Sequence, residues 1–385
     1  MEKTDFRFFI SGAGDLGLRV LRRLLQSGRV PGISPQDCIC ETQTGVKNPI
    51  LKSMGLAARV PDDSIVSADN ILICFPPSPD YPSQVERVLR NWNKKGRAVL
   101  ISSTTVFTEK EGAWVGEDSP IQAETPIARA EKIAIENGAH VVRLAGLYDR
   151  ARGPHVFWQA RPQIDNFGEG WINLIHRTDA ANFISEFFMR DEFFDPKVWN
   201  LSDGNPLTRN EISKLWSDWV GVAPSVFTGV EGDMGKRISS RKSHEALQWV
   251  PRFESFKDFI LSFKNPRNVF GGPLKICCDR PVTGFYRDGS CKVGDDDFGV
   301  HSVCCEITNE FLEFSKAAGN DLSTPRVEFG FPGLKSGDRW CLCASRWMEA
   351  LIAGKAPRIY LESTAERTLE FVEIEVLKKH GLDLS

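Results

Sequence analysis

Short apolar runs alternate with amphipathic stretches along the first part of the chain. Phe6–Ile10 is a nearly continuous apolar run. Leucine and valine then recur at helical spacing from Leu16 to Leu25, and Gly28 closes that stretch. Short apolar runs are typical of strands buried on both faces, and their alternation with helices predicts a doubly wound parallel sheet. Further strands are expected at Asp37–Cys40, Ala57–Val60, Asn70–Phe75, Ala98–Ser102 and Val141–Ala145, with helices at Ser83–Trp92 and Ile127–Asn137.

The pattern changes after the sixth expected strand. Residues 155–263 are expected to form a smaller cap on the substrate side. A helix is predicted at Thr178–Met189, a strand at Val198–Leu201 and a second helix at Asn210–Val220. Thr208 precedes that second helix, and its hydroxyl is suited to accept a hydrogen bond from the first helical turn.

A glycine-rich stretch, GAGDLG at residues 12–17, lies between the first expected strand and the first helix. In a dinucleotide fingerprint the first glycine permits a tight turn, the second lets the backbone approach a pyrophosphate, and the third allows close helix–strand packing. The open N–H groups at the helix start then face the phosphates. The alternative is a turn without a ligand. The strand–helix context favours a Rossmann-like cofactor cradle formed by Gly12, Ala13, Gly14, Asp15, Leu16 and Gly17.

Glu41 stands at the expected end of the second strand. A carboxylate there can accept hydrogen bonds from the adenosine ribose and repels a 2′-phosphate, which favours NAD over NADP. The alternative is a surface glutamate in a turn. Asp15 suits a helix N-terminus, but its carboxylate is expected to point away from a bound pyrophosphate.

Several motifs occur in a fixed order: SGAGDLG, ILICFPPSP, SSTTVF, RLAGLYDRARGP, INLIHRTDAANFI and WNLSDGNPLTRNE. This set resembles extended, atypical short-chain dehydrogenases/reductases of the NAD-dependent epimerase/dehydratase kind, over Phe6 to Phe263. The resemblance implies that Gly12, Gly14 and Gly17 hold the pyrophosphate. It further implies that Asp62 or Asp63 lies near the adenine, that Phe75, Pro76 and Pro77 line the cofactor, and that Ser102–Thr105 lie beside the nicotinamide.

The proton-transferring pair of that family, Tyr-x-x-x-Lys, is missing. None of the four tyrosines lies in the helix expected at Ile127–Asn137, and Lys132 in that helix has Ala128 four residues before it. Ser103 and Thr104 are the remaining catalytic candidates; the alternative is that these hydroxyls bond local backbone. His176 is expected to be a packed, hydrogen-bonded side chain.

These features predict an oxidoreductase or epimerase that acts on a small or sugar-like substrate. The alternatives are a non-catalytic dinucleotide-sensing module, or thiol or metal chemistry in the C-terminal region. With a net charge of −3 and scattered lysine and arginine, the sequence does not indicate a basic patch that would bind nucleic acid. No apolar segment has the length of a membrane span. A cytoplasmic protein is expected, with a small-molecule substrate as partner and a homodimer as a candidate assembly.

Seven of the ten cysteines lie in residues 264–385, which are expected to form a second, small Cys-rich α+β domain after a first domain of residues 1–263. Without a secretory signal they are expected to be reduced. Segments such as NVFGGPLKICC, DDDFGVHSVCC and FGFPGLKSGDRWCLCASRWMEAL look like domain-of-unknown-function family 2237, which implies no activity. Helices are expected at Glu310–Ala318, Trp347–Ala353 and Ala365–Val372, and a strand at Ile359–Leu361.

Three hypotheses remain open for the chemistry of this second region. His301 with Cys304, or Cys341 with Cys343, suggests a metal site, but the spacing is off the usual zinc pattern, and no metal is assigned. A reactive thiol at Cys341 or Cys343 would be activated by Arg339 and Arg346. Buried, reduced cysteines are the third reading, and the acidic run at residues 295–297 is expected to be a solvated turn.

Overall fold

The computed structural model describes residues 5–27, 29–150, 152–161, 163–190, 197–230, 232–294, 297, 299–326 and 331–384. Two compact units are present: unit 1 is Met1–Ile260 and unit 2 is Leu261–Ser385. Gly28, the expected end of the first helix, lies outside the described residues.

Unit 1 is built on a seven-stranded parallel sheet with the strand order β12-β7-β5-β4-β1-β2-β3. The order reverses direction at β1, so that the chain winds first to one side of the first strand and then to the other. The expected Rossmann-like doubly wound sheet is therefore confirmed. Its strands are β1 (Asp5–Ser11), β2 (Cys38–Glu41), β3 (Ala57–Arg59), β4 (Ser67–Ile73), β5 (Ala98–Ser103), β7 (His140–Leu144) and β12 (Val198–Leu201).

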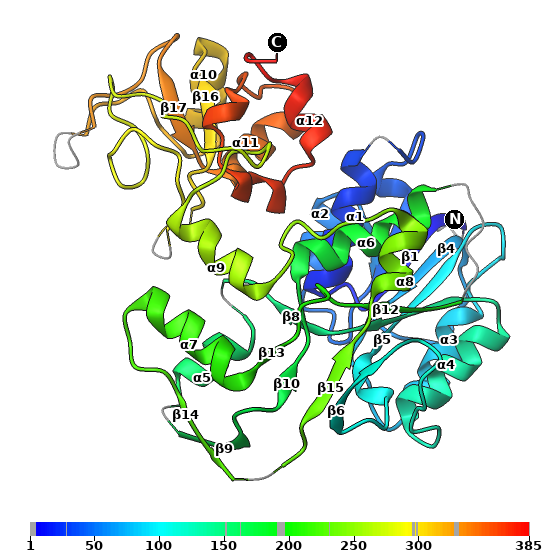
Figure 1. Ribbon diagram of the computed structural model, residues 1–385. Coiled ribbons are helices and arrows are strands. Elements are labelled where there is room, and N and C mark those ends of the chain that lie inside the picture. Colours follow the sequence, from blue (N-terminus) through cyan, green and yellow to red (C-terminus); the bar gives the residue numbers. More distant parts are fainter. Residues whose placement is uncertain are drawn as a thin grey trace. The chain divides into compact units, whose positions relative to one another are not determined.

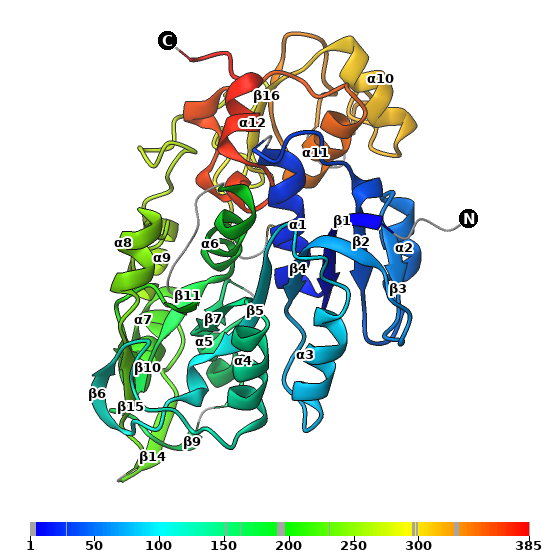
Figure 2. The same ribbon diagram turned by 90° about the vertical axis from the view of Figure 1, so that its right-hand side faces the viewer.

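Helices cover both faces of this sheet, as Figures 1 and 2 show. One face carries α1 (Asp15–Ser27) and α6 (Arg177–Met189), and the other carries α3 (Tyr81–Leu89) and α4 (Pro126–Glu136). Successive residues of β1 point to opposite faces: Phe8 and Ile10 pack in the first core and Phe9 in the second. A continuous apolar run is therefore what a strand between two cores requires.

The cap consists of short elements that pair two by two. Its small sheets are β8 with β11, β6 with β15, β9 with β14, and β10 with β13. Thr208 caps the helix α7 as expected: its hydroxyl accepts from Glu211 N at 3.2 Å, and the Glu211 carboxylate accepts from Thr208 N at 2.7 Å. The elements are β6 (Glu111–Val115), β8 (Gly146–Tyr148), α5 (Pro154–Gln159), β9 (Gln163–Phe167), β10 (Trp171–Ile172), β11 (Leu174–His176), β13 (Leu207–Thr208), α7 (Arg209–Val220), β14 (Val226–Gly229), β15 (Gly235–Ile238) and α8 (Arg241–Leu247).

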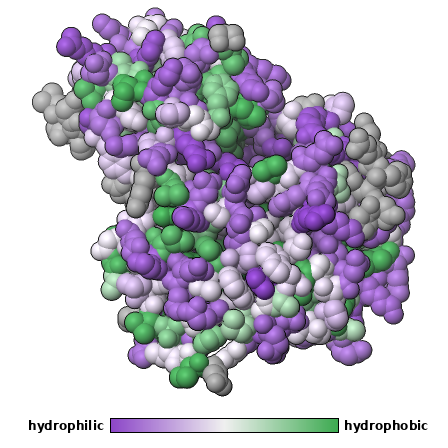
Figure 3. All heavy atoms as spheres, in the orientation of Figure 1, coloured by the Kyte–Doolittle hydropathy of each residue, from purple (hydrophilic) through white to green (hydrophobic). Residues whose placement is uncertain are grey.

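The helices α2 (Asn48–Ser53) and α9 (Phe256–Lys264) complete this part of the chain. In the part of the chain that the structure describes, no helix is both long enough and apolar enough to cross a membrane. Figure 3 shows hydrophilic and hydrophobic side chains interspersed on the face that it views.

Unit 2 contains few regular elements. An antiparallel pair, β16 (Val303–Glu306) with β17 (Arg339–Leu342), packs with α10 (Asn309–Ala317), α11 (Ala344–Ile352) and α12 (Ile374–Lys379) around an apolar core of its own. The strand expected at Ile359–Leu361 is wrong: Ile359 makes only isolated bridges, to Cys305 and Gly381. The helix expected at Ala365–Val372 is a 3₁₀ turn over Glu366–Glu370.

Candidate functional site

The three motif glycines at the junction of β1 and α1 have three different environments. Gly12 has φ +91°, and a Cβ built on it would lie 2.4 Å from Phe75 N. A Cβ on Gly17 would lie 2.8 Å from Gly12 O and 2.9 Å from Cys74 Sγ, so Gly17 allows α1 to pack against the strands. A Cβ on Gly14 would meet nothing closer than Gly12 O at 3.9 Å. Gly12 therefore serves the turn, Gly17 serves the packing, and Gly14 leaves its backbone open to an approaching group.

The backbone of this loop is held by β2. The amides of Gly12 and Ala13 donate to Glu41 O at 3.0 and 3.1 Å. The side chains of Ala13 and Leu16 pack into the core next to α1. The first-turn amides of α1 have no acceptor within the helix, and they carry the positive end of its dipole. The Gly14 amide donates to Gly12 O at 2.7 Å, so the donors left open at the carboxyl end of the sheet, where an anion can be bound, are those of the first turn of α1.

Asp15 is neutralised by arginines. Its Oδ2 accepts from Arg19 Nε at 3.0 Å and from Arg177 Nε at 2.9 Å, and Arg177 also pairs with Asp149. Burial alone would raise the pKa of Asp15, but Arg19 and Arg177 together hold that pKa below its ordinary value. The carboxylate is engaged by these cations beside the open face of Gly14. Arg177 was not a sequence candidate, because nothing in LIHRTD marks its pairing with a residue far away in sequence.

Glu41 lies at the end of β2 and is almost completely buried. Oε1 accepts from Ser11 Oγ at 2.7 Å and from Arg87 Nη2 at 2.6 Å. Oε2 accepts from Arg59 Nε at 3.1 Å and from Arg87 Nη1 at 3.0 Å. Its carboxylate is therefore already engaged by two arginines, and its ribose-binding role stays a prediction.

The expected adenine-side residue lies next to this network. Asp62 is exposed and sits 3.6 Å from Arg59, and its carbonyl oxygen accepts from Arg87 at 3.0 Å. Phe75 follows β4 and packs edge-to-face on Tyr81, while Pro76 is exposed beside it. The structure thus brings the glycine loop, Glu41, Asp62 and Phe75 to the carboxyl ends of β1, β2 and β4, although Arg59 and Arg87 were missed.

The hydroxyls at the end of β5 differ in their surroundings. Ser102 is buried and donates to Glu131 Oε1 at 2.5 Å, and Arg143 binds the same carboxylate at 2.9 Å. Ser103 Oγ accepts from Thr105 N at 3.2 Å and from the Thr105 hydroxyl at 3.0 Å. Ser103 therefore caps a short 3₁₀ turn, Thr104–Val106, and the role of Ser103 and Thr104 in catalysis stays a prediction.

The two tyrosines of unit 1 are core residues. Tyr81 is fully buried and its hydroxyl donates to Ile101 O at 3.1 Å; burial raises its pKa. Tyr148 is fully buried, burial raises its pKa, and its hydroxyl has no hydrogen-bond partner among the described residues. His176 is buried and accepts from Thr178 N at 3.4 Å as the N-cap of α6, which confirms the packed histidine.

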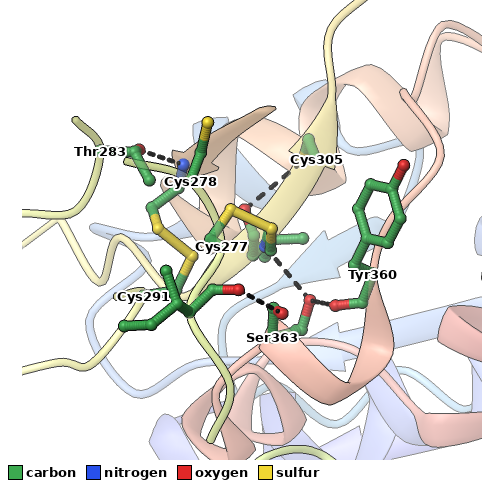
Figure 4. Close-up of a disulfide and its surroundings, with 12 residues drawn as sticks. Cys277, Cys278, Thr283, Cys291, Cys305, Tyr360 and Ser363 are labelled. Atoms are coloured by element: carbon green, nitrogen blue, oxygen red, sulfur yellow. Dashed lines mark hydrogen bonds between the residues drawn. A yellow bond between two sulfur atoms is a disulfide. The ribbon is translucent and has the colours of Figure 1, made fainter. Parts of the chain in front are cut away.

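Four of the seven C-terminal cysteines are cross-linked, so the expectation of reduced thiols is wrong for them. Cys277 bonds Cys304, and Cys291 bonds Cys341. Figure 4 shows the two S–S bonds close together, with Tyr360 and Ser363 beside them. The sulfur atoms of Cys277, Cys291 and Cys341 lie within 4.8 Å of one another, but sulfur in a disulfide is not the thiolate that a metal needs.

The remaining cysteines are free thiols: Cys38, Cys40 and Cys74 in unit 1, and Cys278, Cys305 and Cys343 in unit 2. The reactive-thiol reading is therefore wrong for Cys341. The arginines expected to activate such a thiol have other partners, because Arg339 stacks on Tyr360 and Arg346 pairs with Glu349.

Comparisons with known proteins separate the two units. Residues 267–381 match the family model "Uncharacterized protein conserved in bacteria (DUF2237)". This C-terminal region carries the DUF2237 domain. No curated protein matches the chain.

Solved structures resemble the other part of the chain at low identity. A functionally unknown conserved protein from Silicibacter pomeroyi has a TM-score of 0.52 at 18% identity, over 66% of this chain and 96% of that one. The dTDP-glucose 4,6-dehydratase of Bacillus anthracis, in complex with NAD, has 0.52 at 16%, over 67% and 96%. The UDP-glucose 4-epimerase of Thermotoga maritima, with UDP-glucose, has 0.51 at 17%, over 67% and 98%. At this identity the likeness shows the fold.

Proposed function

We propose that unit 1 binds a nicotinamide dinucleotide, with NAD preferred to NADP, and acts as an oxidoreductase or epimerase on a small or sugar-like substrate. The observation that carries this proposal is the open face of Gly14 between two glycines that are closely packed. A turn without a ligand needs Gly12 and Gly17 for its own packing, but it has no use for a missing side chain at Gly14. A pyrophosphate that approaches the backbone does require this position to have no side chain.

The preference for NAD depends on Glu41. The Glu41 carboxylate at the end of β2 repels the 2′-phosphate of NADP. Arg59 and Arg87, which bind Glu41, would by themselves attract that phosphate. Because both arginines are already paired with Glu41, we infer that the site as a whole favours the ribose without a phosphate. In Glu41→Gln the arginines lose their anionic partner, and the preference is expected to move toward NADP.

Bound NAD supplies a hydride acceptor. Ser103 and Thr104, at the end of β5, are the hydroxyls of this chain that we assign to the substrate side. They can orient a substrate hydroxyl or carbonyl by hydrogen bonding. A hydroxyl without a neighbouring base is a weak proton acceptor, so the proton released when a substrate hydroxyl is oxidised passes to water.

A second function, dinucleotide sensing without turnover, is favoured by one observation. Tyr81 and Tyr148 are both buried, and burial raises the pKa of each instead of lowering it. Neither can serve as the usual proton donor. Under this alternative NAD(H) changes the stability of the protein but no substrate is turned over.

Titration calorimetry of the full chain with NAD⁺, NADH, NADP⁺ and NADPH tests binding. Gly14→Ala is expected to weaken NAD⁺ binding about tenfold or more, equivalent to about 1.4 kcal/mol, without lowering the melting temperature. Gly116→Ala is the matched control, because it lies outside the loop and a Cβ there meets nothing within 4 Å, while a Cβ on Gly14 meets only Gly12 O at 3.9 Å. Equal NAD⁺ affinity in Gly14→Ala, Gly116→Ala and the unmodified chain would contradict the cradle.

A panel of sugar nucleotides and carbonyl compounds then separates the two functions. Nicotinamide absorbance changes that require the substrate support the enzyme. Binding of NAD(H) without any such change across the panel supports the sensor and removes the enzymatic proposal.

A further inference from the structure

Unit 2 brings an aspartate, a histidine and a free cysteine together from segments that are separate in sequence. His301 Nδ1 donates to Asp297 Oδ1 at 2.6 Å, and the His301 amide donates to Asp297 Oδ2 at 2.8 Å. The Cys343 side chain lies close to the His301 ring, because a Cβ built on Gly299 would be 2.7 Å from His301 Cε1 and 3.3 Å from Cys343 Sγ. Nδ1 is bonded to Asp297, and Nε2 is the nitrogen of His301 that this bond leaves open.

Three neighbours fix this arrangement. The Val300 carbonyl accepts from Ala344 N at 3.0 Å, which ties the His301 loop to the start of α11. Phe285 stacks on the His301 ring at 5.7 Å between centroids. A Cβ on Gly299 would come within 2.7 Å of His301 Cε1 and 3.3 Å of Cys343 Sγ, so the glycine leaves room for the histidine and the thiol to meet.

Asp297 is shielded from solvent, whereas His301 and Cys343 are both partly exposed, as a nucleophile and its proton carrier must be. The Asp297 side chain is completely buried, and the His301 side chain is 31% exposed. Cys343 is partly exposed and is the N-cap of α11, where open first-turn amides favour a negative charge. The expectation that residue 297 belongs to a solvated turn is therefore wrong, while residues 295 and 296 lie outside the described part of the chain.

The electrostatics agree with this geometry. The hydrogen bond of His301 to Asp297, together with the neighbouring Cys343 side chain, raises the pKa of His301 to about 10. Burial would raise the pKa of Asp297, but its bonds to His301 hold it below the ordinary value. His301 is thus a cation at neutral pH, held against Asp297 and available to pair with a thiolate.

His301 also forms part of the wall of a cavity of about 400 Å³. Aromatic side chains, two arginines and Asp321 line this cavity, so the arginines and His301 outnumber the one carboxylate. The Arg287 guanidinium stacks over Trp340 at 4.9 Å. Such a lining suits an apolar or aromatic molecule that carries a negative charge. The lining residues used here are Phe285, Arg287, Arg326, Phe331 and Trp340.

We propose that Cys343, His301 and Asp297 form a nucleophilic thiolate–imidazolium centre in unit 2 that acts on the carbonyl carbon of an ester or thioester bearing an anionic group. The Cys343 sulfur forms a C–S bond to that carbon while the bond from carbon to the leaving oxygen or sulfur breaks. His301 gives its proton to the leaving group. Water then attacks the acyl–sulfur bond, gives one proton to His301, and releases the carboxylic acid and the thiolate.

Thiol alkylation of the full-length protein by iodoacetamide tests the nucleophile. Cys278 is the matched control, because it is also free and partly exposed but lies outside the cluster. At pH 6 alkylation of Cys343 is expected to be about tenfold or more faster than that of Cys278, since only thiolate reacts. Peptide mass spectrometry over pH 5–9 measures both rates in one sample.

His301→Asn is expected to slow Cys343 alkylation at pH 6 by about tenfold and to move its pH profile to that of Cys278. Cys305 is fully buried and serves as the folding reporter, because it reacts only if unit 2 unfolds. If the His301 variant exposes Cys305, Asp297→Asn replaces it. An unchanged Cys343 profile in a variant that keeps Cys305 protected would overturn the centre.

The substrate class is tested with two esters, 4-nitrophenyl acetate and the anionic 4-nitrophenyl hemisuccinate. A burst of nitrophenolate with an acyl adduct on Cys343, faster with the hemisuccinate, is the expected result. Arg287→Gln should remove the preference for the anionic ester, so that the ratio of the hemisuccinate burst rate to the acetate burst rate falls toward one. Absence of a Cys343 adduct with both esters would overturn the assignment to acyl chemistry.

Discussion

In unit 1 the glycine cradle lies where a parallel strand ends and a helix begins, whereas in unit 2 the Cys343–His301–Asp297 cluster is assembled from a loop and a helix start. The first position follows from regular backbone, because the carboxyl ends of β1, β2 and β4 meet at one edge of the sheet. The second depends on single contacts, such as the Val300–Ala344 hydrogen bond. Regular secondary structure and single contacts between distant parts of the chain are therefore two different ways of positioning the residues of a site.

The two units also differ in what holds them together. Unit 1 buries both faces of a seven-stranded sheet in two apolar cores. In the described residues of unit 2, a two-stranded sheet packs on an apolar core, and both disulfides join a loop to a strand. Small domains with little regular structure commonly depend on such cross-links. Covalent bonds in unit 2 thus have the role that the extended sheet has in unit 1.

Reduction of the disulfides gives the largest expected difference between the units. The bonds close loops with sequence separations of 27 and 50 residues. Each is expected to contribute about 2–4 kcal/mol by restricting the unfolded chain, so both together contribute about 4–8 kcal/mol. Hydrogen exchange read peptide by peptide, with and without a phosphine reductant, should show loss of protection in residues 267–381.

Unit 1 is the control for this experiment, because its described cysteines, Cys38, Cys40 and Cys74, are all free. Its protection is expected to remain unchanged. If reduction left unit 2 as protected as before, the core of unit 2 alone would be sufficient, and the contrast between the units would be wrong.

The same contrast explains which features the sequence could predict. The strand at Phe6–Ile10 was predictable because burial between two helix layers requires a continuous apolar run, and the capping box at Thr208 because its two partners are three residues apart. The pairing of Arg87 with Glu41 joins residues far apart in sequence. Only the folded chain brings them together, so no local pattern announces it.

In unit 2 the local pattern was misleading. The spacing of His301 and Cys304 suggested a shared site, but Cys304 is bonded to Cys277, while His301 is hydrogen-bonded to Asp297 and lies beside Cys343. β16 and β17 were not predicted; α10 and loops separate the two strands along the chain, so no tight turn between them marks their pairing. Where long-range contacts determine a fold, spacing along the chain carries little information.

The free energy of unfolding should depend on pH in opposite directions for the histidines of the two units. His155 in unit 1 is buried between Trp216 and Phe256, and burial lowers its pKa to about 4. Between pH 4 and 6.5 the unfolded chain binds a proton that the native unit does not. The free energy of unfolding of unit 1 should therefore fall as the pH drops, by up to about 1.4 kcal/mol per pH unit.

His301 in unit 2 behaves in the reverse way, because its pKa is raised to about 10. Its contribution to the free energy of unfolding is complete below pH 6.5. Between pH 6.5 and 10 only the native state holds the proton, so this contribution is lost as the pH rises through that range. Denaturant unfolding of the full chain, followed by hydrogen exchange in each unit, measures both slopes. His155→Phe and His301→Asn should each flatten one slope only; a slope that persists in its own variant belongs to another group.

The smallest expected effect comes from the same residue type in the same role in both units. Thr208 caps α7 in unit 1, and Thr308 caps α10 in unit 2, where its hydroxyl accepts from Phe311 N at 3.1 Å. Replacing either with alanine leaves a helix amide without its acceptor and should cost about 1 kcal/mol. Thr→Ser at the same positions keeps the hydroxyl and should cost much less.

Comparing Thr208 with Thr308 is informative because the hydrogen bond from hydroxyl to helix amide is nearly the same in both, at 3.2 and 3.1 Å, while the surrounding units differ. Thr208 has a reciprocal partner in Glu211, so Thr208→Ala removes one of two linked bonds, whereas Thr308 accepts a single one. In Thr208→Ala the protection of unit 1 should fall by about 1 kcal/mol and that of unit 2 should stay constant, with the reverse in Thr308→Ala. A loss that spread to both units in either variant would mean that the two unfold as one body, and the contrast between a sheet-built and a cross-linked unit would then describe their architecture but not their stability.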